Sequence, residues 1–293
     1  MKRVILFFMT ISLLSCSKEE TNLNDSADFN NIKAKSSGFT VGEIHNDYMD
    51  LVNNSFIGDE TITNLNDGYG FYYSFLENYT NTYPKFTNDE KSLFLNSYNN
   101  HKNLLHSNNV VGIINNNVLI DNPLKNKQTT LSELIFDLKE NNVIGNDEFT
   151  KINNLQYTLS QAFEGNISYE SFDLFIKDLA NDVSENDYLL LDPISSIAVH
   201  SNDWWTTNSP EIYLPEPIGS VNPEDSNYTT YAVPVVAMDA AGALIGAAGT
   251  AINQHYNNNG KITVGAVATG AVIGAVVAST GIVGRLGKWL SRI

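Results

Sequence analysis

Two long apolar segments near the C-terminus constrain the fold more than any other feature of the sequence. Asp239 is the one charged residue from 231 to 252, and residues 262–283 contain no charged residue. Polar residues 255–261 separate the two segments, and Pro234 stands near the start of the first, where the first turn of a helix tolerates proline. The pattern predicts a helical hairpin over residues 231–293, with Pro234 in the first turn of its first helix.

Glycines recur at helical spacing in both apolar segments. Gly242 and Gly246 form one Gly-x-x-x-Gly pair, and Gly270 and Gly274 form another. Glycine costs up to about 1 kcal/mol relative to alanine inside a helix, so a stripe of glycines needs a compensating interaction. Small residues four apart allow two helix backbones to approach closely. We therefore predict that these four glycines are the helix-contact residues of a glycine-zipper hairpin.

The hairpin can be placed in two environments. At a rise of about 1.5 Å per residue, each segment reaches about 33 Å, which is enough to cross a hydrocarbon core of about 30 Å. In a membrane, Arg285, Lys288, Trp289 and Arg292 would provide cationic and aromatic anchors at the interface. Asp239 would be costly in lipid, however, and the many alanines and glycines keep the hydrophobicity moderate. A buried hairpin wrapped by amphipathic helices is therefore slightly favoured over permanent insertion.

Residues 38–230 carry the pattern of an amphipathic helical body. Thr87 with Glu90, and Thr130 with Glu133, form capping boxes ahead of apolar runs, and residues 149–163 and 172–179 show apolar stripes at helical spacing. We expect about five to seven helices here, and hence an all-α fold, an amphipathic helix bundle with the C-terminal glycine-zipper hairpin. Glycine and proline are expected to separate the helices at Gly58, Gly112, Pro123, Gly145 and Gly165.

The N-terminus indicates export and a lipid anchor. Lys2 and Arg3 precede an apolar run over residues 4–14, which is too short to span a bilayer and is typical of a signal peptide. The ending Leu13-Leu14-Ser15-Cys16 resembles the lipobox of bacterial lipoproteins. That resemblance implies cleavage after residue 15, lipidation of Cys16, and a flexible tether over residues 16–37. The alternative is an ordinary signal peptide with an incidental cysteine.

The residues after Cys16 bear on localisation. Ser17 is not the aspartate associated with inner-membrane retention of lipoproteins, and Lys18-Glu19-Glu20 resembles the export signal of surface lipoproteins of Bacteroidota. The resemblance implies a protein anchored by lipid in the outer membrane and exposed at the cell surface. A solvated, charged linker is the alternative interpretation of the same residues.

The charge distribution argues against one class of partner. Without residues 1–15 the chain has 15 basic and 33 acidic residues, a net charge of −18. Residues 16–230 carry −21, whereas residues 231–293 carry +3. Nucleic-acid binding requires a basic surface, so no nucleic-acid partner is expected. No cysteine other than Cys16 is present to form an intramolecular disulfide.

No catalytic, cofactor-binding or metal-binding motif is recognised in the sequence. His45 lies among Glu43, Asp47 and Asp50, but none of these stands three or four residues away as helical metal ligands usually do. We interpret His45 as a surface histidine or a satisfied core histidine. There is also no Gly-x-Ser-x-Gly element and no phosphate-binding glycine loop. We therefore expect no enzyme activity, no metal and no cofactor.

Three short blocks resemble a group of uncharacterised secreted proteins of Bacteroidota. They are residues 41–50, which contain a Gly-x-x-His-Asn run and a hydrophobic-Asp pair, residues 197–205, which end in Trp204-Trp205, and residues 239–243. The resemblance implies common family membership and carries no activity with it. The tryptophan pair could form an exposed recognition patch, although core packing is the favoured interpretation.

These patterns favour a non-enzymatic, lipid-anchored surface or envelope lipoprotein whose hairpin contacts or inserts in membrane. Membrane is the expected partner, through the N-terminal lipid and, in the inserted arrangement, through the hairpin, and no protein partner is specified by the sequence. Two other functions stay open. One is a pore-forming antibacterial protein resembling colicins or two-peptide bacteriocins in architecture. The other is a helical adhesion or interaction module in which the hairpin is the buried core.

Overall fold

The computed structural model describes residues 41–58, 68–101, 108–208 and 229–290, and all of them belong to one compact unit over residues 32–293. The predicted signal peptide, Cys16 and the tether lie outside the described residues. Residues 231–290 of the predicted hairpin fall in the same unit as the acidic body. The body helices and the hairpin can therefore be treated together.

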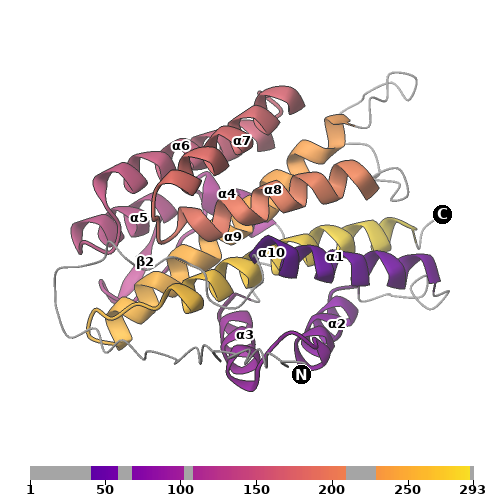
Figure 1. Ribbon diagram of the computed structural model, residues 1–293, viewed down its shortest axis with the longest axis horizontal. Helices are drawn as coiled ribbons and strands as arrows, with labels where there is room; N and C mark the ends of the chain where they lie inside the picture. The colour runs from indigo at the N-terminus through magenta and orange to yellow at the C-terminus, as the bar shows by residue number, and fades with distance from the viewer. Residues whose placement is uncertain (1–40, 59–67, 102–107, 209–228, 291–293) are drawn as a thin grey trace, which may run out of the picture. The chain divides into compact units, whose positions relative to one another are not determined.

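The fold is all-α, as the sequence predicts, apart from one small β-hairpin (Figure 1). The body contains eight described helices, more than the five to seven expected, because short α4 is too brief to give a periodic signal. They are α1 (Val41–Gly58), α2 (Gly68–Thr82), α3 (Asn88–His101), α4 (Asn108–Ile114), α5 (Leu131–Glu140), α6 (Asn146–Phe163), α7 (Tyr169–Glu185) and α8 (Leu191–Asn208). The C-terminal hairpin consists of α9 (Thr229–Asn257) and α10 (Val264–Leu290).

Both predicted capping boxes are present. The Thr130 side chain accepts a hydrogen bond from the backbone of Glu133, and the Glu133 carboxylate accepts one from the backbone of Thr130. Thr87 and Glu90 make the same reciprocal pair at the start of α3, at 3.2 and 2.7 Å. Each box satisfies backbone donors that the first turn of a helix would leave without partners.

The β-hairpin was not predicted. Strands β1 (Ile120–Asn122) and β2 (Lys127–Thr129) pair antiparallel, and Asn126 in the connecting turn adopts a positive φ of 49°. Strands of three residues are too short to show alternation of polar and apolar side chains. Asn122 fixes this hairpin to α5, since its amide donates to the Asp137 carboxylate at 2.7 Å.

Gly112 does not separate two helices, contrary to the prediction. It lies inside α4, and its carbonyl accepts hydrogen bonds from the backbone N–H groups of Asn117 and Val118. A Cβ at Gly112 would lie 2.5 Å from Cγ2 of Val118. The glycine is therefore required because the chain folds back against the helix at this point.

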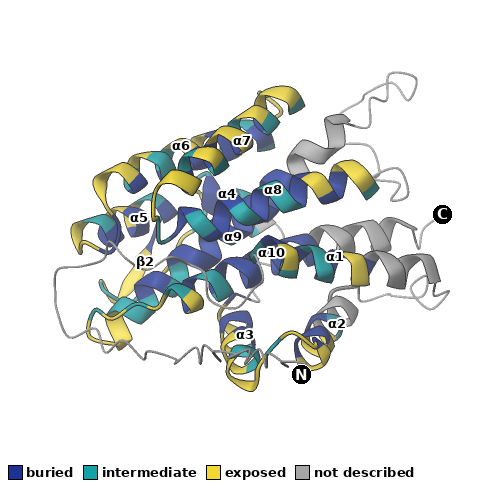
Figure 2. Ribbon diagram, in the orientation of Figure 1, coloured by how far each residue is buried: buried dark blue, intermediate teal, exposed yellow. Residues whose placement is uncertain are grey.

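The α9–α10 hairpin forms the centre of the bundle. Helix α9 packs mainly against α4, α5, α6, α7 and α8 and also touches α3, whereas α10 packs against α1, α2, α3 and α8. Residues 235–248 of α9 and 270–280 of α10 are buried throughout (Figure 2). One described segment, Val235–Asn257, is long and apolar enough to cross a membrane, and 89% of its apolar window is buried inside the bundle.

The hairpin boundaries differ slightly from the prediction. Helix α9 begins at Thr229, so Pro234 falls in the second turn and not in the first. The helix also continues to Asn257, into the segment predicted as a turn. The reversal is made by Asn259 and Gly260, whose φ angles of 53° and 84° lie in the left-handed region that asparagine and glycine tolerate best.

Candidate functional site

A buried carboxylate lies at the centre of the bundle. Asp239 on α9 has no exposed surface. Its Oδ1 accepts a hydrogen bond from Ser279 Oγ on α10 at 2.5 Å. Its Oδ2 accepts from Ser201 Oγ at 2.7 Å and from Trp205 Nε1 at 3.1 Å, both on α8. Because a buried charge is costly without partners, these donors allow the carboxylate to sit in the core, and they join three helices at one point.

Helix α1 contributes a histidine to the same cluster. His45 is fully buried, and its Nε2 lies 3.4 Å from Asp239 Oδ2 and 3.1 Å from Ser279 Oγ. The Nδ1 atom faces Asn46 Oδ1 at 3.2 Å, and the Asn46 amide in turn donates to the backbone carbonyl of His200 at 2.9 Å. His45 is therefore the satisfied core histidine that was one of the two interpretations of the sequence. We call His45, Ser201, Trp205, Asp239 and Ser279 the buried polar cluster.

The buried polar cluster contains Ser, His and Asp but not the geometry of a nucleophilic triad. In such a triad one imidazole nitrogen faces the nucleophile and the other faces the carboxylate. Here the Ser279 hydroxyl and the Asp239 carboxylate both lie on the Nε2 side of His45. All three side chains are also completely buried, so no substrate reaches them in this conformation. The arrangement is suited to holding helices together.

Three short segments of the sequence, residues 41–50, 197–205 and 239–243, meet at this cluster. His45 comes from the first segment, Ser201 and Trp205 from the second, and Asp239 from the third. Helices α1 and α8 approach closely beside the cluster, and a Cβ at Gly42 would lie 2.4 Å from Nδ1 of His200. A single interior contact thus joins three distant parts of the chain.

Trp204 and Trp205 are both buried, which confirms the core-packing interpretation. They are 5% and 0% exposed, and their rings meet edge to face with centroids 4.9 Å apart. Trp204 Nε1 donates to Asp50 Oδ1 at 2.7 Å, so each indole N–H reaches a carboxylate on a different helix. The pair therefore serves as a double connection from α8 to α1 and α9.

The predicted helix-contact glycines lie where the two hairpin backbones are closest. A Cβ at Gly246 would lie 2.0 Å from the carbonyl oxygen of Gly270, and one at Gly242 would lie 2.3 Å from that of Gly274. A Cβ at Gly274 would lie 1.9 Å from the carbonyl oxygen of Gly242. No side chain larger than hydrogen fits at these positions unless the helices move apart.

The other residues predicted to act in anchoring fall outside what the structure describes. Cys16 and Arg292 lie outside the described residues, and the side chains of Arg285, Lys288 and Trp289 are not described. Among the side chains that are described, no group of three or more His, Cys, Asp or Glu residues could hold a metal ion.

Glu148 is a buried acid that sequence reasoning did not single out. It stands in the first turn of α6, and its Oε1 accepts hydrogen bonds from the backbone N–H groups of Leu190 at 2.6 Å and Leu191 at 3.2 Å. Burial raises the pKa of Glu148 to about 7, although these backbone donors act in the opposite direction. The side chain caps the start of α8 from another helix, a long-range role that no local pattern reveals.

Comparisons of the chain with protein-family models, with curated proteins and with solved structures give no match. The function is therefore inferred from the sequence and the structure of this chain alone.

Proposed function

We propose that this chain is a non-enzymatic lipoprotein held at the outer membrane through Cys16, and that its helical part is an interaction module with the glycine-zipper hairpin as its core. The observation that carries the proposal is the burial of the hairpin, because 89% of the apolar window in Val235–Asn257 is covered by other parts of the bundle. An apolar helix that is already covered needs no lipid to remove it from water. On this account the lipid supplies membrane attachment and the body supplies recognition.

The buried polar cluster also favours a core role for the hairpin. Moving α9 into a bilayer would separate Asp239 from its donors on α8 and from His45 on α1. Leaving a buried hydrogen-bonding group without its partner costs about 1–3 kcal/mol, and an aspartate at the centre of a membrane helix costs about 2.5–3.5 kcal/mol. Both costs favour the packed state.

The test is the behaviour of a protein beginning at Ser17, which lacks the lipid. We expect it to be soluble and monomeric without detergent in size-exclusion chromatography, and to stay at the bottom of a density gradient when mixed with phosphatidylcholine–phosphatidylglycerol liposomes. The lipidated chain is the matched positive control and should float. A lipid-free protein that needs detergent, or that floats with the liposomes, would contradict the proposal.

A second function, membrane insertion by a released hairpin, has one observation in its favour. The segment Val235–Asn257 has the length and composition of a membrane-spanning helix and is wrapped by amphipathic helices, which resembles the layout of pore-forming colicins. This function predicts that the lipid-free protein releases an encapsulated dye from liposomes. Dye retention at every pH at which the protein stays folded would eliminate it.

A further inference from the structure

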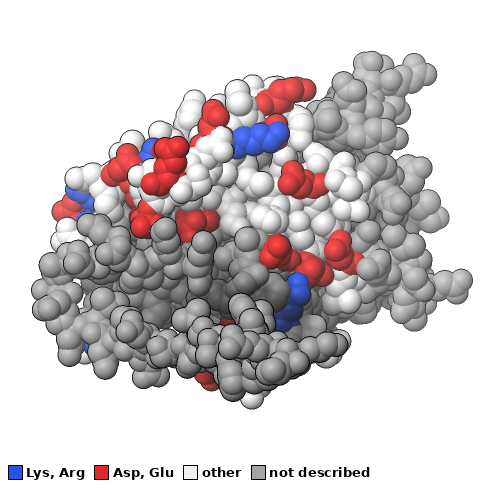
Figure 3. All heavy atoms as spheres, in the orientation of Figure 1, with Lys and Arg blue, Asp and Glu red and all other residues white. Residues whose placement is uncertain are grey.

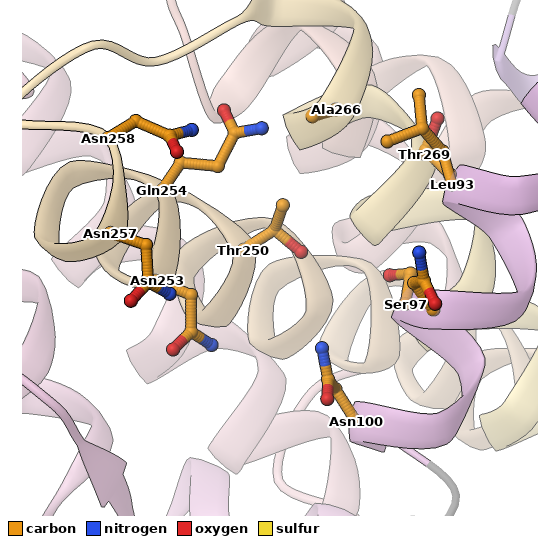
Figure 4. Close-up of a pocket in the computed structure, with 11 residues that line it drawn as sticks. Leu93, Ser97, Asn100, Thr250, Asn253, Gln254, Asn257, Asn258, Ala266 and Thr269 are labelled. Atoms are coloured by element: carbon orange, nitrogen blue, oxygen red, sulfur yellow. The ribbon is translucent and has the colours of Figure 1, made fainter. Parts of the chain in front are cut away.

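A cavity of about 200 Å³ lies beside the turn of the hairpin, away from the buried polar cluster, and most of the residues that line it have polar side chains (Figure 4). It is bounded by α3, by the C-terminal part of α9 and by the first turns of α10. Ser97 and Asn100 on α3 lie across it from Thr250 and Asn253 on α9. Three helices far apart in sequence thus enclose one small recess.

The lining of the cavity consists mainly of neutral hydrogen-bonding groups. Among the described residues that line it, six are Asn or Gln, three are Ser or Thr, and none is acidic or basic. Each carboxamide offers two N–H donors and an acceptor oxygen, and each hydroxyl can both donate and accept. Leu93 is the larger of the two apolar lining residues and is 41% exposed.

Ser97 shows that the lining is incompletely satisfied. Its side chain is only 8% exposed, and its Oγ makes no hydrogen bond to any described part of the chain. A buried hydroxyl without a partner costs about 1–3 kcal/mol. The Ser97 oxygen lies just beneath the lining, and it would gain a partner only if α3 shifted slightly when the cavity is filled.

Two of the amides are held in position before any ligand arrives. Asn253 Nδ2 donates to the Gly249 carbonyl at 2.9 Å, and Gln254 Oε1 accepts from the backbone N–H of Thr263 at 2.8 Å. These contacts fix both side chains on the hairpin and leave the Asn253 oxygen available. Preorganised groups lose little entropy on binding, which favours affinity from few contacts.

We propose that this cavity binds one ring of a neutral saccharide, with the carboxamides hydrogen-bonded to neighbouring ring hydroxyls and Leu93 against the C–H face of the ring. The volume is below the roughly 300–1,000 Å³ of pockets for drug-sized molecules, as expected for a single sugar ring. None of the described lining residues is ionisable, so these residues offer no charge to pair with a carboxylate, phosphate or ammonium ligand. On the face of the molecule shown in Figure 3, acidic side chains are more frequent than basic ones over the described residues.

The saccharide site deepens the proposed function, because it rests on the body being an interaction module and names the ligand class of that module. The experiment is saturation-transfer-difference NMR on the full mature chain in phosphatidylcholine nanodiscs, with empty nanodiscs as the blank. The probes are glucose, galactose and N-acetylglucosamine, and sodium acetate, methyl phosphate and glycine amide are the charged controls. We expect millimolar binding of at least one sugar and no signal from the charged controls.

Asn100→Ala and its neighbour Asn99→Ala provide the matched pair of variants. Asn100 lines the cavity, whereas Asn99 lies outside the lining, with its amide donating to the Leu95 carbonyl. Both asparagines are exposed on α3, so both variants should stay folded by circular dichroism. Asn100→Ala should weaken sugar binding about tenfold, because the sugar hydroxyl that binds Asn100 would be left without a partner. Asn99→Ala should leave sugar binding unchanged.

Two results would overturn the saccharide site. One is the lack of any sugar signal above the blank, and the other is equal weakening by Asn99→Ala and Asn100→Ala. Neither result bears on liposome flotation of the lipid-free protein, so failure of the saccharide site is distinguishable from failure of the proposed function.

Discussion

The contact between Gly246 and Gly270 provides a direct test of the backbone packing of the hairpin. In Gly246→Ala the new methyl group would start 2.0 Å from the carbonyl oxygen of Gly270, 2.9 Å from the carbonyl carbon of that residue and 3.1 Å from Cα of Gly274. All three are backbone atoms, which cannot rotate away as a flexible side chain can. The helices must therefore separate by about 1.4 Å at this point to reach ordinary contact near 3.4 Å.

The size of the effect follows from two opposing terms. Overpacking a well-packed core costs typically about 1–3 kcal/mol, and more when backbone must shift. Alanine recovers up to about 1 kcal/mol of helix propensity. We expect Gly246→Ala to lower the free energy of unfolding by about 2 kcal/mol, which corresponds to roughly 4–8 °C in melting temperature for a domain of this size. Gly246→Leu should be more severe.

Gly265→Ala is the matched control. Gly265 lies in the first turn of α10 and is exposed, and a Cβ at this position would have no neighbouring atom within 4 Å. The substitution should leave the melting temperature unchanged or raise it slightly. Thermal and urea unfolding followed by far-ultraviolet circular dichroism would measure both variants. A Gly246→Ala protein that melts with the wild type, or above it, would refute the close backbone contact.

Three further predictions concern the body and its connection to the hairpin. Asp239→Ala should lower the free energy of unfolding by about 3–5 kcal/mol, because it leaves the buried donors of Ser201, Trp205 and Ser279 without their acceptor at about 1–3 kcal/mol each, and urea unfolding would measure this loss. For Glu148, the folded-state pKa near 7 lies above the ordinary value of 4.5, so the folded chain binds more protons and the free energy of unfolding should fall by about 3 kcal/mol as pH rises from about 4.5 to about 7. Glu148→Gln keeps an acceptor oxygen and should flatten that part of the pH profile in urea titrations; an unchanged slope would count against the buried acid. Thr130→Ala should cost about 1 kcal/mol through loss of the α5 cap, and equal stability of variant and wild type in the same assay would show that the capping box contributes nothing.

Local features of the fold were predictable from the sequence. The capping boxes at Thr87 and Thr130 mark the starts of α3 and α5 because their hydrogen bonds connect residues three apart. The apolar stripes of α6 and α7 and the Gly-x-x-x-Gly pairs are likewise periodic over a few turns. By contrast, α4 and the β-hairpin are too short to show periodicity. Gly112 has the sequence signature of a helix break, but it lies inside α4 at the place where the following residues fold back against the helix.

The partners of the buried polar cluster were not predictable, because they are distant in the chain. Asp239 was recognisable as the one charge in an apolar segment, and such a charge requires a partner. Nothing local specifies that the partners are Ser201, Ser279 and His45, since several serines and histidines were available. The amide-lined cavity escaped prediction for the same reason, as its lining comes from three helices.

The position of His45 and Ser279 has a consequence for how the chain acquires its structure. These two side chains meet although they are 234 residues apart, one on the first described helix and the other on α10, which follows every other described helix. The body helices thus lack the surface that covers their apolar faces until α9 and α10 have been synthesised. Contacts of such high sequence separation form late, because a long loop must close first. A chain built this way completes its core only after its last two described helices have been synthesised.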